Sequence, residues 1–276
     1  MLLDFHVHLG NCFRQEYPHG RRSPSVHGLI DWMDRNGIDM AVLQPLESPE
    51  VHVGGYYMSE QAVADRDAYA ERLIAFCCFD PRMTDLPRLI DVFVERHGAR
   101  GFGEALNGLA IDDQMNWPIY EKCSEHGIPF VFDMGPTYCR DEVGLPRLER
   151  MLRRFPGCNF CGHGPGFWTA ISGDDPRGGY PEGPITPGGA IDGLMAKYDN
   201  LWLDLSAGSG HNAMTRDPDF AEGFIERHWR KMMFATDYFI VDQQVPNIAW
   251  FRGLDITEQQ REAIGSGNAL RLLGME

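Results

Sequence analysis

Long hydrophobic runs are missing from this 276-residue sequence. No segment approaches the ~18 consecutive apolar residues that a membrane-spanning helix needs, so we expect no membrane partner. The first apolar run begins directly after Met1, which leaves no room for the charged and apolar regions of a signal peptide. These absences predict a cytoplasmic protein.

Positive charge is also scarce, because 25 Lys and Arg stand against 40 Asp and Glu and the formal net charge is −15. Nucleic-acid affinity depends largely on Lys and Arg neutralising phosphates. The charge therefore argues against a nucleic-acid partner and favours a small-molecule substrate.

Paired cysteine motifs and nucleotide motifs are absent as well. The seven cysteines are scattered, and Cys158-x-x-Cys161 has no second pair that would complete a zinc site. Cys161 falls inside an apolar run, which predicts buried thiols rather than disulfides. No G-x-S-x-G elbow or P-loop is present, so nothing supports a serine hydrolase or a nucleoside triphosphatase.

What the sequence does contain is a regular alternation of short apolar runs with helical patterns. The eight runs are Met1–His8, Met40–Gln44, Leu73–Phe79, Ala99–Ala105, Ile128–Asp133, Cys158–His163, Leu201–Ser206 and Lys231–Asp237. Eight strand–helix units in about 250 residues predict a single-domain α/β protein, a (β/α)8 barrel. A doubly wound open sheet is the alternative, but no G-x-G-x-x-G follows the first strand.

One long irregular stretch interrupts this alternation. It runs over residues 165–187, directly after the sixth strand, and is rich in Gly and Pro. Loops of this length in a compact domain are usually functional or disordered. We expect it to form a lid over the carboxyl ends of the strands, with Trp168 lining the substrate pocket.

The first strand carries polar groups that a buried strand does not need. Side chains alternate between faces, which predicts Leu3, Phe5 and Val7 on one face and Asp4, His6 and His8 on the other. Burying such groups without partners costs about 2–7 kcal/mol each. Two histidines two residues apart can bind one metal ion, which would compensate for that cost.

Acids and imidazoles also end other strands, and the catalytic sites of barrels lie at these ends. The residues are His6, His8, Glu104, Asp133, His163, Asp204, Ser206 and Asp237. Such a set suits Zn²⁺ first, with Mn²⁺ or Fe²⁺ as alternatives. A bound metal would activate a water, and a nearby carboxylate would move the proton.

Four segments resemble the amidohydrolase superfamily, and within it the amidohydrolase-2 group of metal-dependent hydrolases and decarboxylases. Asp4-Phe5-His6-Val7-His8 is similar to the family's D-x-H-x-H, and Phe160-Cys161-Gly162-His163-Gly164 to its H-G. Phe234-Ala235-Thr236-Asp237-Tyr238 is similar to its F-G-T-D-Y/F, and Asn268-Ala269-Leu270-Arg271-Leu272-Leu273 to its terminal N-A-x-x-L-L.

The resemblance implies site roles for matching residues. It implies that His6, His8 and Asp237 bind metal, that Asp237 also moves protons, and that His163 is a base or a second metal ligand. Gly103-Glu104 resembles the G-E of TatD-like nucleases, whose glutamate binds or bridges metals. Glu104 is therefore predicted as a ligand, with a hydrogen-bonded support as the alternative, and one or two ions are expected.

One position departs from the family. Asp133 stands where the fifth strand usually ends in a metal-binding histidine. Three interpretations follow: Asp133 is a metal ligand, it contacts the substrate or supports a ligand, or it marks a weakened or lost metal site. We assign it to substrate binding.

These observations lead to one hypothesis with two alternatives. The hypothesis is a metal-dependent hydrolase that uses metal-activated water on a small carbonyl, amide or lactone substrate, with Asp237 and His163 as catalytic residues. The alternatives are a non-oxidative decarboxylase of an aromatic or unsaturated acid, and a non-catalytic small-molecule-binding barrel with a degraded metal site. A homodimer is possible under any of them.

Overall fold

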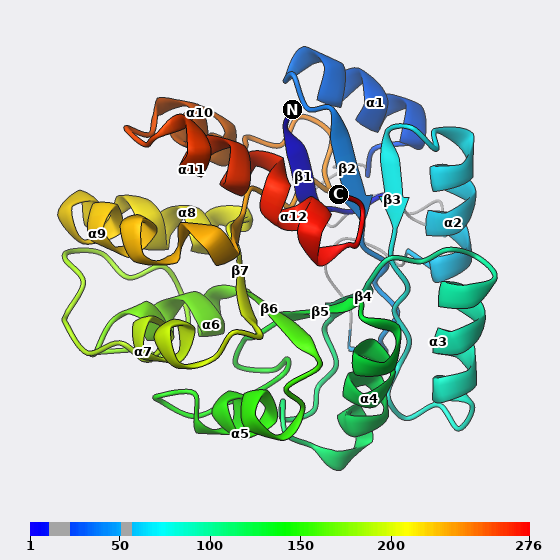
Figure 1. Ribbon diagram of the computed structural model, residues 1–276, viewed down its shortest axis with the longest axis horizontal. Helices are drawn as coiled ribbons and strands as arrows, with labels where there is room; N and C mark the ends of the chain where they lie inside the picture. The colour runs from blue at the N-terminus through cyan, green and yellow to red at the C-terminus, as the bar shows by residue number, and fades with distance from the viewer. Residues whose placement is uncertain (11–22, 51–56) are drawn as a thin grey trace.

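The computed structural model describes residues 1–10, 23–50 and 57–276, and it is a (β/α)8 barrel with helices surrounding a ring of parallel strands (Figure 1). The strands are β1 Leu3–Val7, β2 Met40–Leu43, β3 Leu73–Ala75, β4 Phe102–Ala105, β5 Pro129–Asp133, β6 Asn159–His163, β7 Leu201–Asp204 and β8 Met232–Met233. Each strand lies within one of the eight predicted runs and is shorter than that run. The strands β4, β5 and β6 end on the predicted last residue, and the other five end before it.

The described helices follow the predicted alternation. They are α1 Val26–Arg35, α2 Ser59–Ala68, α3 Leu86–Glu95, α4 Trp117–His126, α5 Pro146–Arg154, α6 Pro165–Trp168, α7 Ala190–Lys197, α8 Ala207–Thr215, α9 Pro218–His228, α10 Pro246–Gly253, α11 Glu258–Glu262 and α12 Asn268–Leu272. Local chemistry sets several ends: the Ser25 and Asp217 side chains accept from backbone N–H groups in the first turns of α1 and α9. None of these helices is long and apolar enough to cross a membrane.

Backbone hydrogen bonds close the ring and exclude the open-sheet alternative. The strands pair in the order β1-β2-β3 and β4-β5-β6-β7-β8, all in parallel. The amides of Cys77 and Gly103 join β3 to β4, donating to Gly101 and Cys77 over 3.0 and 2.9 Å. At the other seam, the Phe5 amide donates to the Phe234 carbonyl over 3.0 Å and the Asp237 amide to the His6 carbonyl over 2.8 Å.

The inside of the barrel is apolar below the site. Leu3, Phe5, Val131 and Trp202 belong to one buried cluster, which Leu272 of α12 also joins. Figure 1 shows α12, in red, close to β1, and Leu272 shares its cluster with Leu3 at the start of that strand. The C-terminal segment therefore closes the amino-terminal end of the barrel, which leaves the carboxyl end for chemistry.

The C-terminal helical segment, α11 to α12, is interrupted by a π-helical turn, Ala263–Gly267. Within this turn, the Ile264 carbonyl accepts a hydrogen bond from the Phe234 amide over 2.8 Å, so the turn is bonded to the residue that follows β8. The Asn268 side chain then donates to the carbonyls of Trp229 and Met232 over 2.6 and 2.8 Å. The terminal segment thus supports the start of β8, which explains the asparagine in its motif.

The predicted alternation of faces in β1 is wrong, because the pairing with β2 is irregular between Asp4 and Val7. Leu3 and Phe5 lie in the inner cluster, whereas Val7 lies in the outer one. Such a bulge re-aims side chains near active sites. Asp4 does not join the histidines: it accepts from the backbone and hydroxyl of Thr236, 2.9 and 2.5 Å away, and burial raises its pKa to about 7.

The stretch predicted as a lid is helical in its first part. Pro165–Trp168 and the 3₁₀ turn Thr169–Ile171 are regular, and Gly166 to Ile171 are buried. The remainder lies across strand ends: Arg177 contacts the Met134 sulfur at 3.5 Å, and the Pro181 carbonyl accepts from the Asn212 amide at 3.2 Å. Closure of this segment over the site stays a prediction.

The six described cysteines are buried free thiols, as expected: Cys77, Cys78, Cys123, Cys139, Cys158 and Cys161. Burial raises the pKa of Cys158 and of Cys161 well above the usual range. The Cys158-x-x-Cys161 pair therefore forms no disulfide and remains in the protonated, packed form.

Candidate metal centre

Residues from four strand ends meet at the carboxyl end of the barrel. Two groups have one ligand atom from each member within 4.8 Å of the others: His6, His8 and Asp237, and His6, Glu104 and His163. The His6 and His8 Nε2 atoms are 3.0 Å apart, and the Glu104 Oε2 lies 3.3 Å from the His8 Nε2. The predicted convergence is therefore present.

The outer nitrogen of each imidazole has its own partner. The His6 Nδ1 lies 2.6 Å from the Asp204 Oδ2, the His8 Nδ1 lies 2.7 Å from the Gln44 carbonyl, and the His163 Nδ1 lies 2.8 Å from the Ser206 Oγ. A carbonyl or carboxylate only accepts, so His6 and His8 each donate an Nδ1–H. This is the arrangement that metal-ligating histidines show in proteins.

These contacts test whether the residues fit a metal. With Nδ1 protonated, neutral His6 and His8 aim two Nε2 lone pairs at one another across 3.0 Å. Such a pair is stable only with a shared cation, either a proton or a metal ion. Metal bonds of about 2.0–2.1 Å to each nitrogen are compatible with that separation. The donor set therefore fits a divalent ion.

Charge in the site is arranged to attract cations. Burial alone would lower the pKa of His8, but hydrogen bonds with Asp237 and Glu104 raise it to about 9. Burial favours neutral Glu104, yet His6, His8 and His163 hold the pKa of that carboxyl well below its usual range. In the metal-free protein, protons on the histidines thus compensate for carboxylates that a metal would otherwise neutralise.

Backbone conformation at the eighth strand end aims Asp237 at this group. Its φ is +58°, in the left-handed region that Asp tolerates better than most residues. The Asp237 carbonyl accepts from the Gln243 side chain over 2.7 Å, which holds the turn. Its Oδ1 then lies 3.3 Å from the His8 Nε2.

Asp133 lies beside the two groups without belonging to either of them. Its Oδ1 is buried and has no hydrogen-bond partner. Burial, followed by repulsion from Glu104, raises the pKa of Asp133 to about 7. Asp133 is therefore the one carboxyl in the mouth that the other residues leave unsatisfied among those the structure describes.

A small cavity of about 160 Å³ opens over these residues. Its apolar walls are Leu46, Leu106 and Phe239, with Tyr138 at one side. The polar lining consists of His8, Glu104, Asp133, His163 and Asp237. No Lys or Arg of the described residues lines it, and three of its lining residues are acids.

Trp168 is not where the sequence placed it. It does not line the cavity and is only 2% exposed, and its Nε1–H donates to the Asp204 carbonyl over 3.1 Å. Trp168 therefore supports the strand that orients His6 and does not touch the substrate space. The second residue after His163, Pro165, begins a helical turn that packs inward, which the loop pattern concealed.

Several contributing residues carried little sequence signal. Gln44 acts through its backbone carbonyl, which any residue could supply, and Ser206 reaches His163 only because β6 and β7 are neighbours. Their positions at strand ends were the available clue. Leu46 and Phe239 follow strands two and eight and were indistinguishable from core residues.

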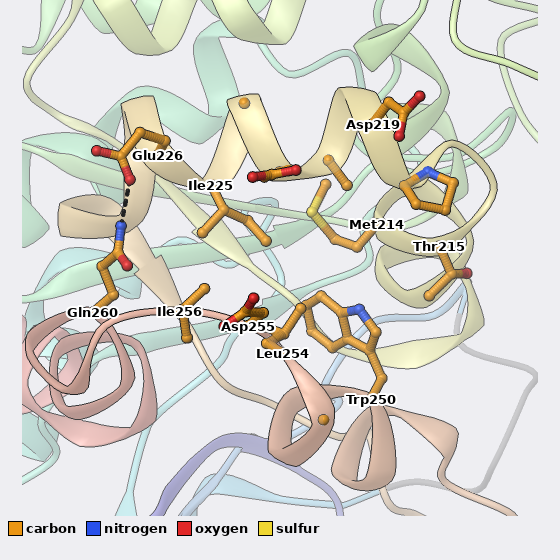
Figure 2. A pocket seen from close by; sticks show the side chains of 15 residues that line it. Met214, Thr215, Asp219, Ile225, Glu226, Trp250, Leu254, Asp255, Ile256 and Gln260 are labelled. Atoms are coloured by element: carbon orange, nitrogen blue, oxygen red, sulfur yellow. Dashed lines mark hydrogen bonds between the residues drawn. The ribbon is translucent and has the colours of Figure 1, made fainter.

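A second acidic region lies on the outside of the barrel. A cavity of about 960 Å³ separates α9 from α10 and the segment that follows it (Figure 2). Asp219, Glu222, Glu226 and Asp255 line it together with Trp250, and all four acids are exposed. We call this the outer groove. None of the described residues that line it is a histidine.

A third group of possible ligands is Asp91, Glu95 and His126 on α3 and α4. The Lys122 ammonium lies 3.0 Å from the Asp91 Oδ1, and the His126 Nε2 lies 2.7 Å from that same atom. Positive charge is therefore already supplied there, and Glu95 is exposed. This group is useful as a comparison for the mouth.

Comparison with known proteins identifies a family and a shared fold. The family model described as Amidohydrolase matches residues 3–275. No curated protein matches the sequence.

Solved structures share the fold at low sequence identity. An uncharacterised TIM-barrel protein from Bordetella bronchiseptica is 19% identical, with 99% of this chain and 98% of that one covered and a TM-score of 0.71. A dihydroxybenzoic acid decarboxylase from Polaromonas, with bound manganese and 2-nitroresorcinol, is 16% identical, with 99% and 97% covered and a TM-score of 0.62. A probable 2-pyrone-4,6-dicarboxylic acid hydrolase from Acinetobacter baumannii, with bound citric acid, is 12% identical, with 99% of both chains covered and a TM-score of 0.64.

Proposed function

The chain belongs to the amidohydrolase family, and on that premise we propose that it is a metal-dependent hydrolase of a small carbonyl compound, an amide or a lactone. The observation that carries the proposal is the acidic lining of the 160 Å³ cavity, where Glu104, Asp133 and Asp237 meet no Lys or Arg from the described part of the chain. A substrate that is itself an acid would be repelled there, whereas a neutral carbonyl compound would not.

The metal would be held by His6, His8 and Asp237, with Glu104 and His163 completing the set or holding a second ion. A divalent cation supplies Lewis acidity, which polarises a carbonyl and lowers the pKa of water from 15.7 towards about 7. The neighbouring dihydroxybenzoic acid decarboxylase contains manganese, so Mn²⁺ is a candidate beside Zn²⁺.

The protein's own side chains would transfer protons and exclude bulk water. Asp237, whose Oδ1 is 3.3 Å from the His8 Nε2, would accept a proton from the attacking water. His163, whose Nε2 is 3.4 Å from the Glu104 Oε1, would pass a proton to the leaving group. Leu46, Leu106 and Phe239 would keep bulk water from the reacting carbonyl.

Decarboxylation of an aromatic acid is the second candidate, since decarboxylases are among the structures with the same fold. A binding barrel with a lost metal site is less well supported, because both ligand groups and the partners of all three histidines are intact.

A two-arm assay separates the candidates. The zinc-loaded and manganese-loaded proteins are given a panel of lactones and amides, with acid release followed by an indicator, and a panel of hydroxybenzoic acids, with CO₂ release followed directly. Hydrolysis in the first arm supports the proposal. CO₂ release without hydrolysis would establish the decarboxylase, and no turnover by protein that binds no metal would favour the binding barrel.

A further inference from the structure

Ser206 is the N-cap residue of α8, a position where a serine side chain usually accepts a hydrogen bond from the first turn of the helix. Among the described residues, no backbone amide of that turn donates to the Ser206 side chain. Its hydroxyl is buried and lies 2.8 Å from the His163 Nδ1 instead. The side chain is therefore used for the histidine rather than for the helix.

The backbone around Ser206 is held in place on both sides. The Ser206 amide donates to the Asp204 Oδ1 over 2.9 Å. The Asn247 side chain of α10 donates to the two flanking carbonyls, Leu205 at 2.9 Å and Ala207 at 3.1 Å. Ala207 has a φ of +58°, in the left-handed region that residues with a Cβ seldom adopt. The surrounding contacts thus hold an unusual backbone conformation that fixes the position of the hydroxyl.

The hydroxyl contacts two imidazoles at unequal distances. The Ser206 Oγ is 2.8 Å from the His163 Nδ1 and 3.5 Å from the His6 Nδ1, which is longer than an ordinary hydrogen bond. The His6 Nδ1 already has the Asp204 Oδ2 at 2.6 Å, whereas the His163 Nδ1 is 3.9 Å from the Asp204 Oδ1. His163 is therefore the histidine that depends on Ser206.

A hydroxyl differs from the partners of the other two histidines because it can both donate and accept a hydrogen bond. The oxygens that bind the Nδ1 atoms of His6 and His8 only accept, which fixes the proton of both rings on Nδ1. Ser206 can accept from a protonated Nδ1 of His163 or donate to a bare one. Its bond to His163 is therefore kept in every protonation state through which the ring passes.

From this arrangement we propose that Ser206 is a positioning residue for proton transfer by His163, whose Nε2 it holds beside Glu104 at the cavity. The inference rests on the proposed function, in which the His163 Nε2 gives its proton to the oxygen or nitrogen of the leaving group. The ring then keeps its other proton on Nδ1 and donates it to the Ser206 Oγ. Ser206 loses no proton and contacts no substrate.

Removal of the hydroxyl tests this, and α8 offers a matched control. Ser209 is also buried in this helix, and its Oγ has no hydrogen-bond partner among the described residues. Ser206→Ala should lower kcat about 10–100-fold, the usual effect of removing a side chain that orients a residue of a metal site, with KM within three-fold of wild type. Ser209→Ala removes the same kind of atom and should change neither constant.

A double-mutant cycle shows through which histidine the hydroxyl acts. In the His163→Gln background, Ser206→Ala should change kcat by less than two-fold, because no imidazole is left to position. Zinc affinity, measured by competition with a chelator, should stay within three-fold of wild type in Ser206→Ala, because His6 keeps its bond to Asp204. A ten-fold loss of zinc affinity, or an undiminished effect on kcat in the His163→Gln background, overturns the proposal.

A measurement without substrate separates this inference from the proposed function. Nitrogen-15 NMR of the zinc-loaded protein reports the ring nitrogens, and single His→Gln variants identify their signals. Ser206→Ala should shift the His163 signals more than those of His6, and Ser209→Ala should shift neither. Unmoved His163 signals, or a larger shift at His6, overturn the inference whatever the reaction is. Shifted His163 signals without hydrolysis in the two-arm assay overturn the proposed function instead, and the role in proton transfer with it.

Discussion

The mouth of the barrel and the outer groove both contain several acids, yet they differ in volume, in the exposure of those acids and in the partners that the acids have. The groove has about six times the volume of the mouth, 960 against 160 Å³, and four exposed acids. Only Glu226 among those acids has a side-chain partner drawn in Figure 2, the Gln260 amide at 2.7 Å. Water solvates such charges, so they can lie together at little cost.

In the mouth, water cannot do this. Glu104 and Asp204 are 4% and 0% exposed, and taking a charge out of water costs several kcal/mol. Each of these carboxylates has an imidazole nitrogen within 3.6 Å. The Nδ1 atoms of His6 and His8 are held in turn by the Asp204 carboxylate and the Gln44 carbonyl. The comparison shows that burial with paired partners, rather than cavity size or number of acids, distinguishes the candidate metal centre from the outer groove.

The largest effect is expected from removing both histidines of β1. The His6→Ala/His8→Ala variant should lose bound metal and activity together, because two of the three members of one ligand group disappear. Elemental analysis and kcat/KM measure the two losses. Asp91→Ala, in the surface group that contains Lys122, is the control and should keep the full metal content. A double variant that still binds one ion per chain would contradict this assignment.

Removing one proton-transfer candidate should have the next largest effect. His163→Gln is expected to lower kcat about 10²–10⁴-fold, the usual contribution of general acid–base catalysis. His6, His8 and Asp237 remain, so at least one metal ion per chain should still be bound. Steady-state kinetics on metal-loaded protein check this. A kcat within five-fold of wild type would remove His163 from the mechanism.

Asp204→Asn should weaken metal binding without abolishing it. The amide keeps the size but loses the charge that fixes the His6 Nδ1–H, and such changes cost about 10–100-fold in metal affinity. Competition with a fluorescent chelator gives the affinity. Asp219→Asn in the outer groove is the matched substitution, and it should change the affinity by less than two-fold.

The pH dependence of stability should distinguish the two regions in metal-free protein. The pKa of Asp133 is about 7 in the folded protein against an ordinary value of 3.8, so between these values the folded state holds a proton that the unfolded state has lost. Stability from this group therefore falls as pH rises from about 4 to 7. Asp133→Asn should gain several degrees in Tm relative to wild type across that interval, whereas Glu222→Gln should not. If the Tm difference between Asp133→Asn and the wild-type protein stayed the same at every pH, the raised pKa of Asp133 would be contradicted.

The smallest effect is expected in the groove itself. Asp219→Asn and Glu222→Gln remove exposed charges that no buried partner needs, so each should change the free energy of unfolding by less than about 0.5 kcal/mol. Urea unfolding measures this. A loss above 2 kcal/mol in either variant would mean that the groove carries structural charge.

Much of the site could be predicted from the sequence because strand ends in a parallel barrel share one edge. His6, His8, Glu104 and Asp237 needed only the position of each strand to be placed together. Trp168 could not be placed, since a four-residue helix turned it inward against Asp204. The orientation of Val7 was also hidden, because the irregularity in β1 between Asp4 and Val7 depends on pairing with a neighbouring strand.

The sequence by itself determined the barrel, its eight strands and the kinds of side chain at its mouth, because hydrophobic periodicity and strand-end polarity are local properties of the chain. Only the tertiary structure decided which nitrogen of each histidine faces the cavity, which carboxyl lacks a partner and which acidic region is buried. These depend on contacts such as His6 with Asp204, 198 residues away, and no local pattern records a distance between segments that meet only after folding.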